Sequence, residues 1–249
     1  MFFSSFCLPK HGNSSEEYED AFSPSKDEED LDSAEHRIAI ADGSSEGLLS
    51  REWARLLVKL YFEDGLPPAH LDDFLGVAYK RWNDWKTFEY LPGREASNRP
   101  IMWFEEPGLE QGAFSTLLGI HFMGLPSSQS GEWEAVSIGD SCVFQIRDNE
   151  LITAFPITQS EEFNNSPYLI CSNPAGNTNI NDKLRCTAGR YQTDDRFFLM
   201  TDALACWFLD ANKCGETPWK FICDLGTEDA TNSFENSVPF SEYITKLGN

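Results

Sequence analysis

Short apolar segments separated by turn residues fill the middle of this 249-residue chain, and they restrict the fold more than any other feature. Each has the length and composition of a strand, and turn dipeptides such as Gly139-Asp140 and Asp148-Asn149 fall between consecutive segments. The segments are residues 112–120, 133–138, 142–147 and 151–155. Their spacing predicts an antiparallel meander. The glycines and alanine of the first segment leave little side-chain bulk, which predicts close packing against another backbone.

Helical patterns flank this strand region on both sides. A predicted strand over 37–41 is followed by apolar residues at helical spacing, with Ser50 as the expected N-cap, and a second helix is predicted over 69–86. Farther along, residues 196–200 are predicted to form a strand and 203–209 the helix that follows it. Strands grouped together with helices outside them favour an α+β fold, in which two sheets pack face to face and helices flank them.

Composition excludes several classes of function. Asp and Glu number 41 against 19 Lys and Arg, a formal net charge of −22, so the chain repels nucleic-acid backbones and anionic membranes and attracts hard divalent cations. Seven cysteines without a Cys-x-x-Cys pair indicate neither a zinc site nor a disulfide framework, which favours a reducing cytoplasm. No apolar run approaches the roughly 20 residues of a membrane span. Neither a glycine-rich phosphate loop nor a Gly-x-Ser-x-Gly elbow occurs.

Carboxylates stand where predicted strands end, at Asp42, Asp140 and Asp202. A carboxylate in this position is held by a rigid element yet faces the edge of the sheet, which suits the binding of metal ions. The pair Glu19-Asp20 precedes an apolar step, which is consistent with an early strand. Taken singly, each is more often a turn or surface residue, because 41 of 249 residues are acidic and Asp-Gly is a common turn dipeptide. Their order along the chain carries the functional interpretation.

In that order, the carboxylates and the segments around them resemble the metal-dependent Ser/Thr protein phosphatases of type 2C, the PPM family, and most of all a divergent bacterial branch. The resemblance extends from about residue 8 to about residue 210. Each motif alone is weak, but five of them in the family's order, in fitting strand contexts, are specific. The motifs are Glu19-Asp20-Ala21, Ile40-Ala41-Asp42-Gly43, Gly112-Ala113-Phe114-Ser115-Thr116, Gly139-Asp140-Ser141-Cys142-Val143-Phe144 and Leu199-Met200-Thr201-Asp202-Ala203.

The resemblance implies one phosphatase domain over residues 1–249, built as a four-layer α-β-β-α sandwich of two antiparallel sheets flanked by helices. It also implies two Mn²⁺ or Mg²⁺ ions in a cleft at one end, with a weaker third ion. By position, Asp42 resembles the carboxylate that bridges the two ions and Asp20 resembles a partner of metal-bound water, which gives these two the catalytic roles. The other ligands implied by position are Glu19, the Gly43 carbonyl, Asp202 and, for the third ion, Asp140.

The implied reaction is hydrolysis of phosphoserine and phosphothreonine in proteins by a hydroxide that bridges two divalent ions. The implied partners are a phosphoprotein substrate and a Ser/Thr kinase system in a bacterial cytoplasm, with no nucleic acid and no membrane. Hard oxygen ligands suit Mn²⁺ and Mg²⁺, and the sequence has no clustered His or Cys that would suit zinc.

The chain departs from the family pattern near both the phosphate and the metal positions. Where many members have an arginine that grips the substrate phosphate, this chain has Ser15, and the nearest basic residues are Lys10 and His11. Cys206 stands four residues after Asp202, where many members have another aspartate. These two basic residues are the expected phosphate-binding side chains.

The C-terminal residues do not identify which residue is the last metal ligand that the resemblance implies. Glu228-Asp229 resembles the closing ligand motif, but no apolar strand follows it, and residues 240–247 have the pattern of the helix that usually precedes that motif. A domain that lacks the final strand is therefore expected. Two other interpretations stay open. One is a catalytically degenerate pseudophosphatase that acts as a phosphoprotein-binding or regulatory module, and the other, resting on acidity alone, is a calcium-binding interaction module.

Overall fold

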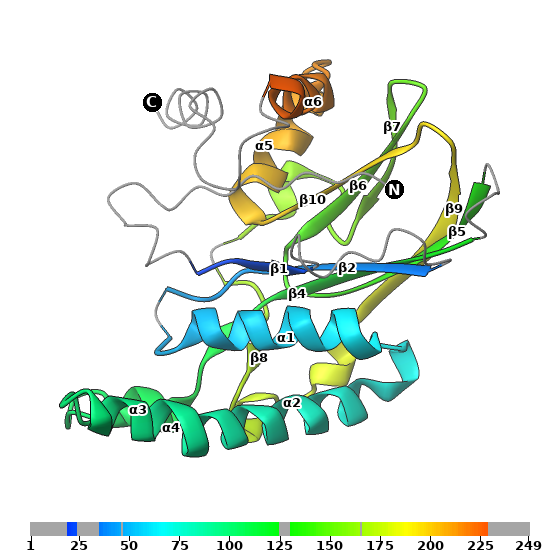
Figure 1. Ribbon diagram of the computed structural model, residues 1–249. Coiled ribbons are helices and arrows are strands. Elements are labelled where there is room, and N and C mark those ends of the chain that lie inside the picture. The colour runs from blue at the N-terminus through cyan, green and yellow to red at the C-terminus, as the bar shows by residue number, and fades with distance from the viewer. Residues whose placement is uncertain (1–18, 24–34, 46, 125–129, 165, 229–249) are drawn as a thin grey trace.

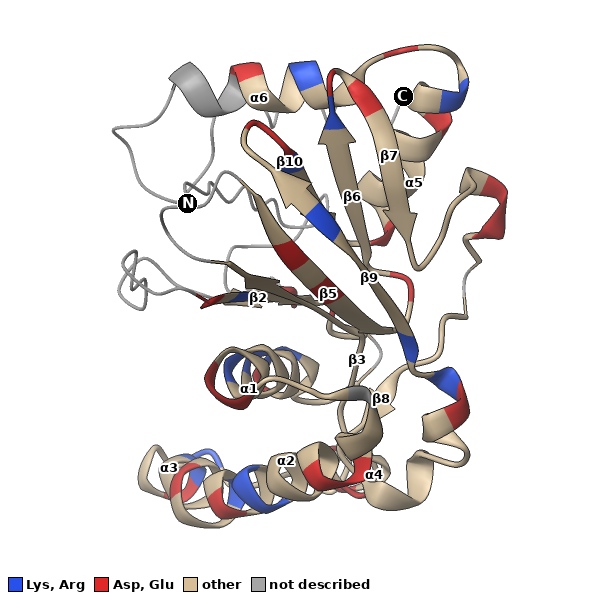
Figure 2. Cartoon of the chain, turned by 90° about the vertical axis from the view of Figure 1, so that its right-hand side faces the viewer, with Lys and Arg blue, Asp and Glu red and all other residues tan. Residues whose placement is uncertain are grey.

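Two antiparallel sheets lie face to face in the computed structural model (Figure 1). Helices cover the outer face of each sheet, so the layers follow the order helices, larger sheet, smaller sheet, helices, as the side view in Figure 2 also shows. The predicted four-layer α-β-β-α sandwich is confirmed. The structure describes residues 19–23, 35–45, 47–124, 130–164 and 166–228.

The larger sheet has five strands within the described residues, in the order β1-β2-β4-β5-β9, and every neighbouring pair is antiparallel. These strands are β1 (Ala21–Ser23), β2 (Glu35–Ala41), β4 (Leu117–Met123), β5 (Ser130–Ile138) and β9 (Arg185–Gln192). Leu118, Ile120 and Phe122 of β4 belong to the core between the two sheets. Gly119 faces the helical layer, where any Cβ would collide with the ring of Tyr61 on α1 (Ser50–Asp64). Close packing at Gly119 is therefore confirmed, and the neighbour there is a side chain. At Gly112, the start of the same predicted segment, a Cβ would lie 3.0 Å from the backbone nitrogen of Asn173, so close approach of another backbone is found there.

The smaller sheet pairs three antiparallel strands in the order β10-β6-β7. These strands are β6 (Cys142–Arg147), β7 (Glu150–Phe155) and β10 (Arg196–Met200). Side chains alternate across the sheet, so Val143 faces the larger sheet while Phe144 faces the helices α5 (Asp202–Lys213) and α6 (Pro218–Glu228). Phe144 stacks on Phe208 of α5 with ring centroids 4.4 Å apart, and Trp219 of α6 lies against the same ring. Complete burial of one such side chain contributes about 2–3 kcal/mol.

The antiparallel meander predicted over residues 112–155 is wrong at two places. The predicted strand over 112–120 divides at Thr116, because β3 (Phe114–Ser115) pairs with β8 (Ile170–Cys171) in a separate two-stranded sheet. The second place is the connection between the two hairpins. β4 and β5 form a hairpin in the larger sheet, and β6 and β7 form another in the smaller sheet. The chain changes sheets at Gly139, whose φ of 107° is accessible to glycine and strained for other residues. A Gly-Asp-Ser turn can connect two strands of one hairpin or two strands of different sheets. Which of these connections forms depends on how the two sheets pack against each other.

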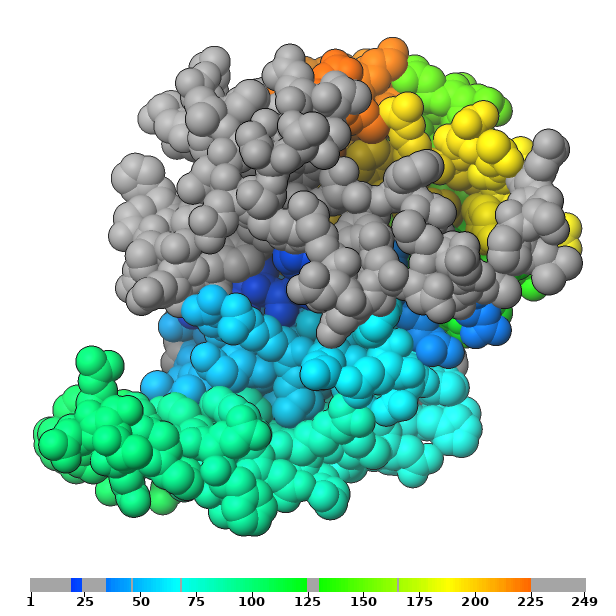
Figure 3. Space-filling model, in the orientation of Figure 1, coloured from blue at the N-terminus to red at the C-terminus, as the bar shows by residue number. Residues whose placement is uncertain are grey.

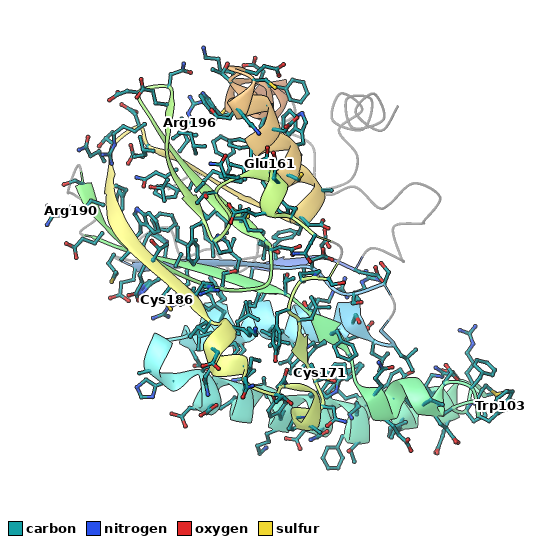
Figure 4. All side chains as sticks on the ribbon, turned by 180° about the vertical axis from the view of Figure 1, so that it is seen from behind. Trp103, Glu161, Cys171, Cys186, Arg190 and Arg196 are labelled. Carbon is teal, nitrogen blue, oxygen red and sulfur yellow. The ribbon has the colours of Figure 1, made fainter. Side chains whose placement is uncertain are left out.

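The helical layer on the larger sheet is longer than the sequence predicts. Both α1 and α2 (Leu71–Trp85) are confirmed, although Ser50 is the first helical residue and Leu49 occupies the N-cap. The chain then continues through a π-helical turn, α3 (Leu91–Ala96) and the returning α4 (Glu106–Gln111), and none of these three contains a buried residue. They project beyond the sheets (Figure 3), with Trp103 at the tip (Figure 4). Across the described ranges, no helix is both long and apolar enough to span a bilayer.

A buried carboxylate joins the two sheets at the turn between β9 and β10. The side chain of Asp195 is 2% exposed and accepts hydrogen bonds from Arg147 Nε at 2.8 Å, Arg147 Nη2 at 2.7 Å, Gln145 Nε2 at 2.8 Å and the backbone N–H of Gln192 at 2.9 Å. Arg147 and Gln145 belong to the smaller sheet and Gln192 to the larger one. Burial by itself would raise the pKa of Asp195, but the hydrogen bonds outweigh it and hold the pKa below its ordinary value.

We expect Asp195→Ala to lower the free energy of unfolding by about 3 kcal/mol at pH 7, because the charged Arg147 and the buried Gln145 amide lose their acceptor. A depressed pKa stabilises the fold above the ordinary value near 4, and this stabilisation is lost as the pH falls below it. Urea unfolding at pH 7 and pH 3 measures both effects, with the exposed Asp84→Ala as the control. Equal destabilisation at the two pH values would contradict the assignment.

Candidate active site

The predicted early strand brings Glu19 and Asp20 to the end of β2. Ala21 pairs with Ala41 in the antiparallel ladder, so one further step places Asp20 opposite Asp42, and a second places Glu19 opposite Gly43. The close approach at Gly43 agrees with this register, since a Cβ there would lie 2.8 Å from the carbonyl oxygen of Glu19. On its other side the same Cβ would lie 3.0 Å from the carbonyl oxygen of Ser50, which leaves space for glycine alone.

Backbone hydrogen bonds fix the position of Asp42 immediately after β2. Its N–H donates to Thr116 Oγ1 at 2.8 Å, and its carbonyl accepts from the Thr116 N–H at 2.9 Å and from Ser115 Oγ at 3.0 Å. Ser115 is also bridged to Gly43. Beside them, Ser45 Oγ donates to Glu19 Oε2 at 2.6 Å. The carboxylate of Asp42 is thus carried on backbone that the Ser115-Thr116 segment holds in place.

Asp140 and Asp202 face each other across the end of the smaller sheet. Met200 of β10 pairs with Cys142 of β6, and two further steps of this register place Asp202 opposite Asp140. Asp140 is only 6% exposed. Burial and the neighbouring Asp202 carboxylate together raise the pKa of Asp140 to about 6. A buried carboxylate whose pKa is raised by a neighbouring, exposed carboxylate is a common sign of a functional site, and a divalent cation between the two would remove their repulsion.

The two ends of the sheets are themselves connected. Thr201, the residue before Asp202, donates from Oγ1 to Asp20 Oδ2 at 3.4 Å. Asp202 begins α5, where its Oδ1 accepts from the N–H of Ala203 at 2.6 Å. The five sequence motifs therefore converge at one end of the sandwich, and they bring together the residues for which metal-binding or catalytic roles are predicted. These residues are Glu19, Asp20, Asp42, Gly43, Asp140 and Asp202.

The donor set suits a hard divalent cation, because it consists of carboxylate and carbonyl oxygens. In the portion of the chain that the structure describes, however, no three Asp, Glu, His or Cys side chains lie close enough together to enclose an ion. The structure therefore brings these oxygen-bearing segments to one end of the sandwich, and a metal site there stays a prediction.

Cys206 lies one turn after Asp202 on α5. It is close to the short helical turn Ser160–Glu162, which contains two glutamates and precedes β8 (Ile170–Cys171). Its Sγ lies 3.8 Å from the carbonyl oxygen of Ser160, next to Glu161, whose position beside α5 is visible in Figure 4. Burial and the carboxylates of Asp210, Asp202 and Glu161 raise the pKa of the Cys206 thiol. A neutral thiol therefore stands one turn after Asp202, where the sequence comparison with the PPM family leads us to expect an aspartate.

Some predicted residues lie outside the described part of the chain. These are Lys10, His11, Asp229 and residues 240–247, so the phosphate-binding and C-terminal predictions stay predictions. Glu228 is the last residue of α6, and nothing is described of its side chain. The structure adds two buried hydroxyls that sequence reasoning did not select, those of Thr116 and Ser141. Both belong to motifs that the sequence had identified, but hydroxyl residues are too common there to signal a role.

Replacing Asp140 tests the electrostatics of the site without metal. A raised carboxyl pKa means that, between about pH 4 and pH 6, the folded protein keeps a proton that the unfolded chain has lost, so stability falls as the pH rises through this window. We expect Asp140→Asn, measured with EDTA, to raise the free energy of unfolding by about 1–2 kcal/mol at pH 7.5, allowing for solvent screening. The gain should disappear near pH 4. Urea unfolding at both pH values checks this, and a gain independent of pH would contradict it.

Comparison with known proteins gives structural neighbours only, because no family model and no curated protein matches the chain. The catalytic domain of the serine threonine protein phosphatase PstP, in complex with two manganese ions, has 18% identity and a TM-score of 0.46 over 84% of this chain and 81% of that one. The Mycobacterium tuberculosis phosphatase PstP/Ppp has 19% identity and a TM-score of 0.43, covering 80% and 76%. The photosystem II phosphatase PBCP has 15% identity and a TM-score of 0.41, covering 73% and 58%. The fold of this chain is thus similar to the folds of these phosphatases.

Proposed function

We propose that this protein is a metal-dependent phosphatase that hydrolyses phosphoserine and phosphothreonine in proteins at the end of the sandwich where its five motifs meet. The observation that carries the proposal is the pairing of buried Asp140 with Asp202 beside the joined Asp20 and Asp42 segments. A pair of Mn²⁺ or Mg²⁺ ions there would neutralise the charge on the phosphoryl oxygens and lower the pKa of water.

Each residue of the site has a proposed role. Asp42 would hold both ions, since its backbone is fixed from two sides by Ser115 and Thr116. Glu19 and the Gly43 carbonyl would complete one ion's ligands, while Asp202 would bind the other. Asp20 would accept a hydrogen bond from the attacking water and orient it toward phosphorus. Asp140 would hold a third, weaker ion.

The proposed partners follow from this reaction. The substrate is a phosphoprotein, and a Ser/Thr kinase must supply its phosphate. Lys10 and His11 are the proposed contacts to the substrate phosphate. The domain is proposed to extend over residues 1–249.

Phosphate release tests the proposal. Purified protein is assayed with p-nitrophenyl phosphate and with phosphothreonine and phosphoserine peptides, with Mn²⁺, with Mg²⁺ and after EDTA treatment. We expect release from all three substrates with Mn²⁺, none after EDTA, and recovery when Mn²⁺ is restored. Activity that survives EDTA, or no release at any Mn²⁺ concentration, would overturn the proposal.

A pseudophosphatase is the second candidate, and Cys206 favours it. This neutral thiol stands one turn after Asp202, at a position where many family members have a carboxylate. A degenerate protein would bind a phosphopeptide without releasing phosphate. Calorimetric titration with a phosphothreonine peptide, followed by a phosphate assay of the same sample, separates the two candidates. Binding without release supports the second, and Cys206→Asp would then be expected to strengthen Mn²⁺ binding.

A further inference from the structure

One buried hydroxyl lies between the two halves of the candidate site. Thr116 is 1% exposed and stands between β3 (Phe114–Ser115) and β4 of the larger sheet. Its Oγ1 accepts the N–H of Asp42 at 2.8 Å and shares a hydrogen bond of 2.9 Å with Ser141 Oγ. A single oxygen atom thus touches both the segment that carries Asp42 and the turn that carries Asp140.

The contact on the Asp140 side is tightly packed. Ser141 is fully buried, and a Cβ at Gly139 would lie 2.5 Å from Thr116 Cγ2 and 2.7 Å from Thr116 Cβ. The turn therefore rests directly on Thr116, with the methyl group against Gly139 and the hydroxyl against Ser141. Since the chain changes sheets at this turn, Thr116 sets where the smaller sheet begins relative to the end of β2.

We propose that Thr116 is a positioning residue whose hydroxyl couples the Asp42 segment to the Asp140-Ser141 turn and fixes the separation of their carboxylates. Its effect on metal binding rests on the proposed function, but the coupling itself does not. A hydroxyl that already accepts from Asp42 N–H and shares its second hydrogen bond with Ser141 has a defined orientation in the core. If either hydrogen bond is lost, the Thr116 hydroxyl can rotate, and the remaining hydrogen bond, to Asp42 or to Ser141, is weakened as well.

Four variants separate positioning from ordinary structural support. Thr116→Val keeps the shape of the side chain and removes the hydroxyl, whereas Thr116→Ser keeps the hydroxyl. Ser141→Ala removes the hydrogen-bond partner of Thr116 on the Asp140 side and leaves the hydrogen bond between Thr116 and Asp42 in place. Thr153→Val is the control, because the half-buried Thr153 Oγ1 likewise makes a hydrogen bond to another side chain, Gln145 Oε1 at 3.3 Å, but lies on β7 away from the site. Each variant is measured by amide hydrogen exchange at Asp42 with EDTA present, by Mn²⁺ titration calorimetry and by thermal unfolding.

We expect Thr116→Val to weaken Mn²⁺ binding about 10-fold or more, in the range found when residues behind metal ligands are replaced, while Thr116→Ser stays within about twofold of wild type. Ser141→Ala should speed exchange of the Asp42 N–H although it does not touch that amide. Thr153→Val should leave both measurements unchanged.

Two results would overturn the inference. One is a Thr116→Val protein that melts earlier yet binds Mn²⁺ as wild type does, which is the behaviour of a merely structural threonine. The other is a Ser141→Ala protein with unchanged exchange at Asp42. If wild-type protein binds no Mn²⁺, the proposed function fails, and the exchange measurement alone then decides whether Thr116 couples the two segments.

Discussion

Asp42→Asn is expected to reduce Mn²⁺-dependent phosphate release by about 10³-fold or more. The substitution keeps the size of the side chain and every backbone hydrogen bond that holds residue 42, including those to Thr116 and Ser115. It removes the one charge proposed to hold both ions, and a metal-bound transition state is stabilised by several kcal/mol, at 1.36 kcal/mol for each factor of ten in rate. Initial rates with p-nitrophenyl phosphate across a Mn²⁺ titration measure the effect.

The control for this variant is Asp84→Asn, on the exposed surface of α2, where the carboxylate pairs with Lys80 at 2.6 Å. We expect its rate to equal that of wild type. Thermal unfolding with EDTA should show that Asp42→Asn remains folded. An Asp42→Asn protein with more than about a tenth of the wild-type rate would remove Asp42 from the metal site.

Asp202→Asn is expected to reduce the rate about 10²-fold at a fixed, low Mn²⁺ concentration and to recover part of it at high concentration. An asparagine oxygen still accepts the hydrogen bond from Ala203 N–H, so the start of α5 is kept. The charge opposite Asp140 is lost, which weakens binding of the ion and also lowers the pKa of Asp140 toward its ordinary value. Mn²⁺ titration calorimetry measures the affinity directly.

Asp210→Asn is the matched control for Asp202→Asn, because both aspartates lie on α5 and Asp210 is exposed. Its carboxylate meets only the Ser160 hydroxyl among the hydrogen bonds described, at 3.5 Å. We expect no change in rate or affinity. If both variants lose the same activity, the acidic face of α5 as a whole matters, and the specific role of Asp202 is wrong.

The sequence predicts the sandwich well where one face of an element is buried. Apolar periodicity identifies α1, α2 and the strands β2, β5, β6, β7 and β10. Each of these elements contributes apolar residues to the core between the two sheets or to one of the two cores between a sheet and the helices that cover it. Apolar periodicity misses α3 and α4, because they have no buried residue and therefore no apolar stripe. It also misses β9, an edge strand that pairs only with β5 and has no buried residue. The sheet change at Gly139 is also missed, since a local turn pattern does not specify which sheet follows.

The sequence selects the carboxylates of the candidate site but not the hydrogen bonds that hold their segments in place. Order along the chain selected Asp42, Asp140 and Asp202, and the registers of β1 with β2 and of β10 with β6 bring their segments to one end. Long-range hydrogen bonds such as that between Thr116 and Ser141, 25 residues apart, have no signature in one sequence. Such contacts depend on the packing of the two sheets, which only the folded chain defines.

Anomalous diffraction from crystals grown with Mn²⁺ tests the central claim most directly, because it locates the ions without reference to activity. We expect peaks about 2.0–2.6 Å from the Asp42 carboxylate, the distances of oxygen ligands to such cations, with one of them also contacting Asp202. Peaks confined to other acidic surfaces, such as Glu161 and Asp210, or none near Asp42 at saturating Mn²⁺, would contradict a metal centre at the strand ends.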